Sequence, residues 1–424
     1  MRQTSRRTFI NSAAAAAGLM IIPPHVLGGP GHTPPSETIT RASIGVGAQG
    51  FRRMLENKEG EPPVLLAVCD LDKNHLKRAL EKAGPRCQGY SDFHRVLDRK
   101  DIDTVHIATP DHWHALITIA AAQAGKDILC EKPMTHTVRE GDAVIAAVKR
   151  NNRVLHVNTQ GRHLWTRHRK LVASGLLGSP LTVYLGPSTG FDWKLKEWTG
   201  RTDLTPQAVP AELDYDFWLG PAPVKPYHPH RVHGTFRGYW DYAGGGLMDM
   251  GQHYLDPVQY FLDKDDTGPA EVTALAPPQH PDAAGLWGRI TCKYADGSTI
   301  ILDSGEWDTC PEETRPMIEG PKGKVFGGRR GNQTDPPGLW QQLEKLSDPP
   351  KLIPFEDAVK LRQFTNGDKP NAEQGHRSAT LLHLATIAIR TSRKITWDPA
   401  NQQILTDPAA SELLNPPMRP PWHL

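Results

Sequence analysis

The feature that most constrains this chain is a group of three glycines near its start. They form the pattern Gly45-x-Gly47-x-x-Gly50, which follows a short apolar stretch and precedes a helix-like one. In a dinucleotide site the first glycine permits a tight turn, the second lets the backbone approach a pyrophosphate, and the third lets helix and strand pack closely. The amino end of the helix then offers free N–H groups to phosphate. Alone, the pattern is as typical of a plain loop as of a nucleotide site.

An acidic residue at the expected distance favours the nucleotide site. The apolar stretch at residues 64–70 ends in Asp70, 20 residues after Gly50. A carboxylate there can accept hydrogen bonds from the ribose hydroxyls of NAD and would repel the 2′-phosphate of NADP. The alternative is an ordinary aspartate at the end of a strand. Glycines and spacing together predict NAD as the cofactor, with NADP less favoured.

Strand-like and helix-like stretches alternate as far as residue 160. Apolar strand-like runs occupy residues 64–70, 104–110, 126–133 and 154–160, and helix-like runs lie between them. This alternation predicts an α/β fold whose first domain, residues 37–160, is a Rossmann domain with a doubly wound parallel sheet. Ligands of such a sheet bind beyond the carboxyl ends of the strands. Those ends carry Asp70, Thr109–His114 and Glu131–Pro133.

Three further motifs resemble one known family. Glu131-Lys132-Pro133 is similar to the E-K-P signature of the Gfo/Idh/MocA oxidoreductases, and ATPDHWHA at 108–115 is similar to their T-P-x-x-x-H segment. GGGLMDMGQHYLD at 244–256 resembles their G-G-x-x-x-D-x-G-x-H segment. The resemblance implies the Rossmann domain followed by a C-terminal α/β domain with an open, mostly antiparallel sheet. It also implies a nicotinamide cofactor and sugar or polyol substrates.

The same resemblance implies a catalytic set of Lys132, Asp249 and His253. Oxidation of a secondary alcohol needs a base for the hydroxyl proton, and histidine suits that role near neutral pH. Asp249 and His253 are four residues apart, so on a helix they share a face, where the carboxylate can orient the imidazole. Lys132 can stabilise a developing alkoxide. A solvated surface pair is the alternative for Asp249 and His253.

The expected cofactor contacts come from the glycine turn and the strand ends. They are Gly45, Gly47, Gly50, Asp70, Thr109, Pro110, His114, Glu131 and Lys132. His114 is expected near the nicotinamide, and Asp111 stands where the family often has asparagine. Asp111, His112 and His114 also raise the idea of a metal-dependent hydrolase or isomerase. No partner ligands follow at helical spacing and no H-E-x-x-H occurs, so no metal is expected.

The second half of the chain predicts a substrate and oligomerisation domain at residues 161–400. An irregular, aromatic-rich segment at 187–246 is long enough to be functional. Trp193, Trp218, Tyr239 and Trp240 are candidates for stacking on sugar rings; alternatively they only pack the segment down. Alternating stretches after residue 270 predict antiparallel strands with a turn at 296–297, and residues 376–395 predict a helix. The family's sheet commonly forms dimers or tetramers, and residues 401–424 are expected to be an extended tail.

The first 36 residues read as an export signal and a Pro- and Gly-containing linker. Arg6 and Arg7 precede a modest apolar run from Phe9 to Ile22, which is typical of a twin-arginine signal. The run is too short and too weakly apolar for a stable membrane span. We therefore expect the twin-arginine export machinery as a partner and a periplasmic or otherwise exported location. A chance arginine pair before an amphipathic helix is the alternative.

Composition excludes other classes. Lys plus Arg is 49 and Asp plus Glu is 47, so the net charge of +2 lacks the basic excess of a nucleic-acid-coating protein. The 5 cysteines form no C-x-x-C pair. The sequence thus favours an exported NAD-dependent oxidoreductase of sugars, polyols or glycosides whose cofactor stays tightly bound. Redox-neutral glycoside cleavage through a 3-keto intermediate and non-catalytic sugar binding remain alternatives.

Overall fold

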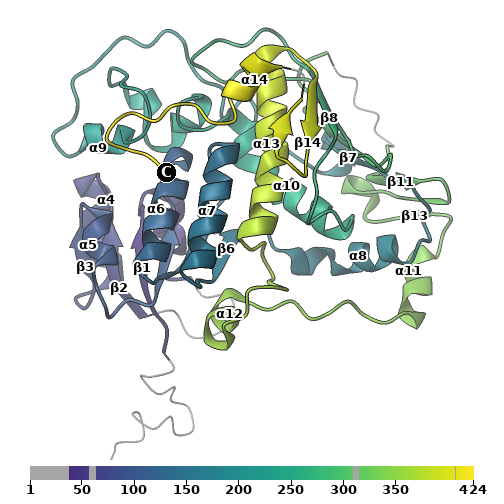
Figure 1. The fold of residues 1–424 in the computed structure, drawn as a ribbon, viewed down its shortest axis with the longest axis horizontal. Coiled ribbons are helices and arrows are strands. Elements are labelled where there is room, and N and C mark those ends of the chain that lie inside the picture. The colour runs from purple at the N-terminus through teal and green to yellow at the C-terminus, as the bar shows by residue number, and fades with distance from the viewer. Residues whose placement is uncertain (1–37, 57–63, 309–314, 406) are drawn as a thin grey trace, which may run out of the picture. The chain divides into compact units, whose positions relative to one another are not determined.

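A computed structural model describes residues 38–56, 64–308, 315–405 and 407–424 of the chain (Figure 1). The predicted export signal and linker, residues 1–36, lie outside the described residues. Within the described residues, no helix combines the length and the apolar character that a membrane crossing requires.

The first domain is a parallel sheet of six strands, as the alternating pattern predicts. The strand order is β3-β2-β1-β4-β5-β6, so the order reverses between β1 and β4. This reversal is the point at which ligands bind in doubly wound sheets. The strands are β1 (Thr40–Ile44), β2 (Val64–Cys69), β3 (Gln88–Tyr90), β4 (Thr104–Ile107), β5 (Asp127–Glu131) and β6 (Leu155–Asn158).

Helices flank this sheet, and their ends follow local sequence signals. Asp72 and Asp92 cap the helices that follow them, and Thr137 forms a capping box with Glu140. Such side chains satisfy amide groups that the first helical turn leaves unpaired. The helices are α3 (Ala48–Arg53), α4 (Lys73–Ala83), α5 (Phe93–Leu97), α6 (Asp111–Gln123) and α7 (Val138–Arg150).

The second domain is built on a mixed, mostly antiparallel sheet, which confirms the expected fold. In the described part of the chain nine strands pair in the order β13-β12-β11-β7-β10-β9-β8-β14-β15, with β7 and β10 parallel. Gly297, with φ of 87°, makes the predicted turn between β9 and β10. The strands are β7 (Thr182–Leu185), β8 (Glu271–Leu275), β9 (Arg289–Lys293), β10 (Thr299–Asp303), β11 (Ile318–Gly320), β12 (Gly323–Val325), β13 (Thr334–Asp335), β14 (Ile395–Asp398) and β15 (Gln403–Ile404).

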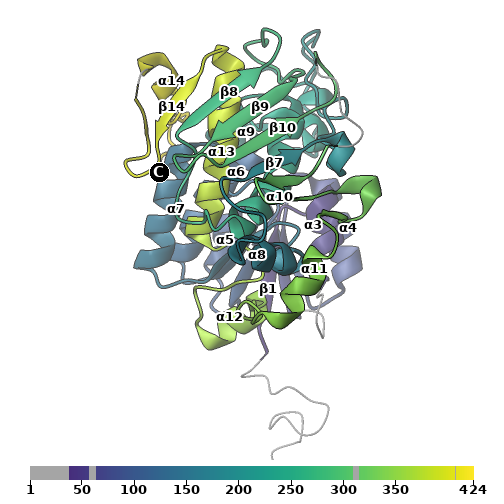
Figure 2. The ribbon, with the colours of Figure 1, turned by 90° about the vertical axis from the view of Figure 1, so that its right-hand side faces the viewer.

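Two long helices join this sheet to the first domain. Helix α13 (Ala372–Thr391) packs on α7, on α10 (Gly245–Phe261) and on β8, and Figure 2 shows it behind strands β8 to β10. It begins before the predicted helix because Asn371 and Gln374 form a capping box. The shorter helices are α8 (Thr166–Ala173), α9 (Tyr215–Leu219), α11 (Leu339–Gln342), α12 (Phe355–Leu361) and α14 (Pro408–Glu412).

The last residues correct the expectation of a simple extended tail. Residues 401–412 contain β15 and α14, and the chain then returns to the first domain. The Arg419 guanidinium donates to the carbonyl oxygen of Gly220, in the irregular segment of the second domain, at 2.8 Å, and the ring of Trp422 lies 4.8 Å from that of Trp113 in the first domain. Specific polar and aromatic contacts therefore hold the segment after α14.

A buried arginine joins the start of the second domain to α10. Arg162 donates to Asp256 at 3.0 Å and to Asp265 at 2.6 Å, and the side chains of Arg162 and Asp256 are 2% and 0% exposed. Removing one partner of a buried ion pair leaves an uncompensated charge in the interior.

Replacing Arg162 with methionine should therefore lower the free energy of unfolding by about 3–5 kcal/mol. Urea denaturation of the variant, with and without added cofactor, measures the loss. Lys149→Met is the control, because Lys149 and Glu373 form an exposed pair worth at most about 1 kcal/mol. Equal losses in the two variants would contradict the importance of the Arg162 contacts.

Candidate active site

The glycine turn has the close packing that a pyrophosphate site requires. A Cβ on Gly45, whose φ is 82°, would lie 2.6 Å from the Ala108 carbonyl oxygen, and one on Gly50 would lie 1.8 Å from the Gly45 carbonyl oxygen. On Gly47 the nearest atoms would belong to the His75 ring, at 3.4 Å. Gly45 and Gly50 thus form the tight turn. Because Gly47 has no side chain, the outer side of the turn is left open, so that a pyrophosphate can approach the protein backbone there.

A cavity of about 770 Å³ extends from this turn to the second domain. It brings together most of the predicted cofactor and catalytic residues, which come from both domains. Those that line it are Gly45, Gly47, Asp70, Thr109, Pro110, His114, Glu131, Lys132, Asp249 and His253. Gly50 does not line the cavity, because it packs beneath the turn.

Asp70 lies at the carboxyl end of β2, beside the glycine turn. One carboxylate oxygen accepts from the Val46 amide at 2.8 Å and the other from the Asp72 amide at 2.9 Å. These bonds fix the position of the carboxylate in the cavity lining. Asp72 places a second carboxylate beside it, and two acids in this position disfavour the 2′-phosphate of NADP.

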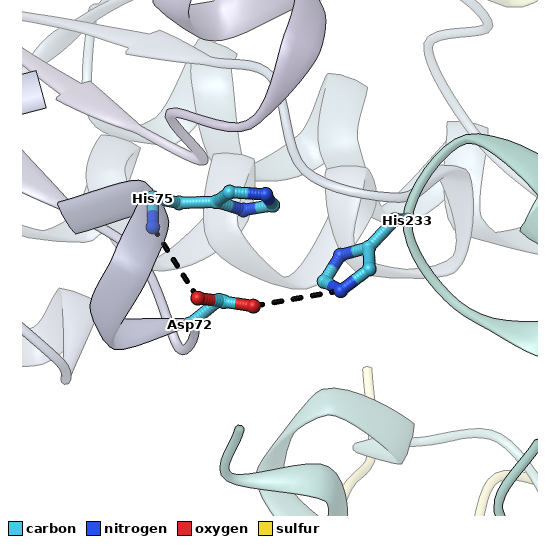
Figure 3. Close-up of side chains that lie close together, drawn as sticks. All are labelled: Asp72, His75 and His233. Atoms are coloured by element: carbon cyan, nitrogen blue, oxygen red, sulfur yellow. Dashed lines mark hydrogen bonds and ion pairs between the residues drawn. The ribbon is translucent and has the colours of Figure 1, made fainter. Parts of the chain in front are cut away.

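Asp72, His75 and His233 form a group that sequence spacing did not predict (Figure 3). Asp72 caps α4 through the His75 amide at 3.3 Å, and its other oxygen lies 3.5 Å from His233 Nε2. One potential ligand atom from each residue lies within 4.8 Å of the others. The positive end of α4 and nearby Arg78 disfavour a cation there, so we assign no metal to the group.

His114 ties together the two loops that carry cofactor residues. Its ring nitrogens lie 2.6 Å from the Pro133 carbonyl oxygen and 2.9 Å from that of Thr109. Burial lowers the pKa of this imidazole. The hydroxyl of Thr109 is buried without a partner among the described residues, which leaves a polar group available to a bound cofactor.

Lys132 and Asp249 meet across the two domains. Lys132 Nζ lies 2.8 Å from an Asp249 carboxylate oxygen and 2.6 Å from its carbonyl oxygen, and the Arg237 Nε donates to the same carboxylate oxygen at 2.7 Å. Burial opposes the charge on Asp249, but Lys132 and Arg237 hold its pKa below the ordinary value. This corrects the expectation that Asp249 orients His253, because its carboxylate is engaged by two cations instead.

The sequence did not predict Arg237 as a residue of the site. It lies in a 3-10 helix (His233–Gly238) within the irregular aromatic segment, where no periodicity or motif distinguishes it. Its guanidinium also lies over the rings of Trp198 and Phe236, at 4.9 Å from each centroid. The segment thereby contributes a cation to the end of the cavity that Lys132 and Asp249 line.

His253 is partly buried at the cavity wall and is held in its neutral form. Burial first, and then the Lys132 charge, lower its pKa to about 3. Its Nδ1 has no partner among the described residues. A neutral, unpartnered imidazole is suited to accept a proton from a ligand.

Glu131 supports the lysine that follows it. Its carboxylate accepts from Asn158 Nδ2 at 2.6 Å and lies 3.2 Å from His106 Nε2. Burial opposes ionisation, but His106 and Asn158 hold the pKa of Glu131 at about 2. Glu131, held through one carboxylate oxygen by His106 and Asn158, fixes the end of β5 from which Lys132 projects.

Two family descriptions match consecutive parts of the chain. Residues 40–159 match "Oxidoreductase family, NAD-binding Rossmann fold", and residues 163–424 match "Oxidoreductase family, C-terminal alpha/beta domain" of the Gfo/Idh/MocA proteins. The chain belongs to the Gfo/Idh/MocA oxidoreductase family. This confirms the expected family and an NAD-binding first domain.

Relatives of this Gfo/Idh/MocA chain have names from sugar and polyol chemistry. Inositol 2-dehydrogenase of Salmonella typhimurium is 29% identical over 195 residues, which are 43% of this chain and 54% of the relative. Alpha-N-acetylgalactosaminidase of Shewanella oneidensis is 29% identical over 181 residues, 40% of this chain and 39% of the relative. The chain thus spans about half or less of these relatives' length.

A solved structure shares the fold. The WlbA dehydrogenase from Bordetella pertussis, in complex with NADH and UDP-GlcNAcA, superposes with a TM-score of 0.57 at 19% identity. The match covers 85% of this chain and 99% of that one. At this identity the likeness supports the two-domain architecture alone.

Of the four aromatic candidates, Trp218 lines the cavity and the other three do not. Trp193 is 2% exposed and packs edge-on against Tyr254 and Trp287 in the core of the second domain. Tyr239 is fully buried, and Trp240 borders a separate cavity of about 140 Å³. The burial of Trp193 and Tyr239 favours the alternative, in which these side chains pack the irregular segment down.

Alanine at Gly50 and at Gly47 should have different effects. Gly50→Ala forces its Cβ against the Gly45 carbonyl and should lower the free energy of unfolding by about 1–3 kcal/mol. Gly47→Ala should change it by no more than about 0.5 kcal/mol. It should nevertheless weaken NAD binding at least about tenfold, since its Cβ occupies the ligand side of the turn.

Thermal unfolding without cofactor and calorimetric titration with NAD separate the two effects. If Gly47→Ala bound NAD as tightly as the unmodified protein, the turn would not be the pyrophosphate site.

Proposed function

We propose that this protein is an NAD-dependent oxidoreductase that oxidises a CH–OH group of a sugar, polyol or glycoside. The observation that carries the proposal is the single cavity that joins the glycine turn to Lys132 and His253. The turn would hold the pyrophosphate, Asp70 the adenosine ribose, and Thr109 and His114 the nicotinamide end. When bound, the nicotinamide supplies the hydride acceptor.

Three side chains of the cavity would accept the proton of the substrate, stabilise the negative charge on its oxygen and hold these groups in position. His253, neutral and without a partner, accepts the hydroxyl proton of the substrate. Lys132 faces the same cavity and stabilises the negative charge that develops on that oxygen. Asp249 forms an ion pair with Lys132 and holds its side chain in place, so it acts as a positioning residue.

The relatives' names support the substrate class. The inositol dehydrogenases favour a polyol or sugar, and the galactosaminidase favours a second candidate, in which a glycoside is cleaved without net oxidation. A non-catalytic sugar-binding protein would not need a charged Lys132 beside a neutral His253. Asp70 and Asp72 favour NAD over NADP.

Dehydrogenase activity should depend on both residues. His253→Ala should lower turnover by about 10²–10⁴-fold while leaving NAD binding intact, because a general base contributes that factor. Lys132→Met should lower it by about 10²–10³-fold. His94→Ala is the control, because the His94 side chain is 53% exposed and does not line the cavity.

The test begins with protein purified without added cofactor. Mass spectrometry of the denatured protein identifies any released nucleotide, and a panel of myo-inositol, aldoses and glycosides is then screened for nicotinamide reduction. Reduction at the wild-type rate in His253→Ala would overturn the assigned base. A bound nucleotide other than NAD(H) would overturn the cofactor.

We also propose that the protein is exported through the twin-arginine machinery, with its cofactor bound. Arg6 and Arg7 before the apolar run support this, and the pathway carries folded proteins. Replacing both arginines with lysine should leave the chain in the cytoplasm. Cell fractionation checks this, with a cytoplasmic and a periplasmic marker enzyme as controls. Equal export of both forms would contradict the proposal.

The expected assembly is a homodimer or homotetramer. The open, mostly antiparallel sheet supports this proposal, because one of its faces is the surface that the family commonly uses. Sedimentation of the purified protein measures the mass, and a monomer at all concentrations would contradict it.

A further inference from the structure

One acidic residue of the cavity has no use in the function proposed so far. Asp111 is the first residue of α6, is 5% exposed and lines the cavity. Its carboxylate makes no ion pair and no hydrogen bond to another of the described residues. Asp70, Glu131 and Asp249 line the same cavity, and each is engaged by amides, by Asn158 or by cations. Asp111 is therefore an acid that faces ligand space without a protein partner.

The surroundings of Asp111 favour its neutral form. Burial is the main reason that its pKa is raised to about 7; the Arg237 and Lys132 charges limit the rise, and the Asp249 charge adds to it. Glu140 of α7 is another acid within electrostatic reach, and burial raises its pKa to about 7 as well. The neighbouring His112 and His114 of α6 are kept neutral by burial.

Asp111 and His253 have opposite acid–base character within one cavity. His253 is an unpartnered base, and Asp111 is an unpartnered carboxylic acid. Environments that push two titratable groups apart in this way typically mark an acid and a base. Oxidation of an alcohol uses the base alone, so the acid indicates a second proton transfer.

We propose that Asp111 is a catalytic acid that protonates the leaving oxygen of a glycoside substrate. The inference rests on the proposed oxidoreductase function and deepens it: the substrate class is a glycoside, and the oxidation prepares a cleavage. The ketone that cleavage requires would be the product of that proposed oxidation, for which a bound NAD would supply the hydride acceptor.

His253 and Asp111 together account for both protons that move in the cleavage step. Once a carbonyl is in place, His253 takes the proton from the adjacent carbon, and that C–H electron pair forms a carbon–carbon double bond. The bond from the next carbon to the leaving oxygen breaks, its electron pair stays on the oxygen, and the oxygen takes the Asp111 proton. An alcohol departs, and the charge left on Asp111 is stabilised by Arg237 and Lys132.

The depressed basicity of His253 allows it to serve twice. It accepts the hydroxyl proton during oxidation and returns that proton to water, because burial and the Lys132 charge lower its pKa. It is then neutral again for the carbon-bound proton. Asp111 regains its proton from the water that subsequently adds to the double bond.

The experiment compares leaving groups that need the acid with those that do not. Methyl and nitrophenyl glycosides of common hexoses, matched sugar by sugar, are given to the cofactor-loaded enzyme and to its Asp111→Asn variant. Release of methanol should fall by about 10²–10⁴-fold in the variant, because methoxide leaves only with a proton. Release of nitrophenol should fall less than about tenfold, since nitrophenolate leaves unaided.

Glu140→Gln is the matched control. Glu140 is buried and has a pKa raised to about the same value, but it does not line this cavity. It accepts from the Thr137 amide in the α7 capping box, which glutamine also does. This variant should release both alcohols at the wild-type rate.

A second measurement needs no substrate. Infrared difference spectra between about pH 5 and about pH 9 report carboxyl groups that are protonated near neutrality. Asp111→Asn should remove one such signal, and Glu140→Gln another. An unchanged spectrum in Asp111→Asn would mean that Asp111 is ionised, and would overturn the proposal.

The other outcomes are equally decisive. Equal losses for methyl and nitrophenyl glycosides, or no loss for either, overturn the assignment of Asp111 as an acid. Nicotinamide reduction by a polyol with no alcohol released from any glycoside also overturns it, but leaves the oxidoreductase function standing. Absence of nicotinamide reduction by every probe counts against the proposed function itself.

Discussion

The contact between Lys132 and Asp249 is the interaction on which the site depends. It joins the end of a strand in the first domain to a helix of the second, and so sets the distance between the nucleotide turn and the residues that act on the substrate. Arg237 adds a second cation to the same carboxylate. The side chains of Lys132, Asp249 and Arg237 are largely buried. The position of each charged group therefore constrains the positions of the other two.

The cavity is chemically divided along its length. One end offers a glycine backbone and strand-end carboxylates, which suit a phosphate-linked nucleotide. The other offers Lys132, neutral His253 and Asp111 with its raised pKa, which suit proton transfer around a neutral carbohydrate. This division explains how one fold serves many substrates: the irregular aromatic segment forms much of the second end and can vary without disturbing the first.

The fold was predictable because it rests on short-range signals. Gly45 and Gly50 sit where only glycine fits, and the alternating runs give each strand and helix its place. The cavity residues that follow strands, such as Lys132 and Thr109, were predictable for the same reason. Arg237, His233 and the burial of Trp193 were not, because their roles come from contacts with residues far away in sequence. The helical spacing of Asp249 and His253 correctly put both on the cavity, but could not show that Lys132 would take the carboxylate.

The separation of Lys132 and Asp249 along the chain has a consequence for biogenesis. They are 117 residues apart, and the helix that carries Asp249 is held in turn by α13, near the end of the described chain. A nascent chain that has only its first domain therefore offers a nucleotide turn without the wall that encloses the ligand. Stable nucleotide binding therefore requires that translation has passed α13 and that both domains have folded together.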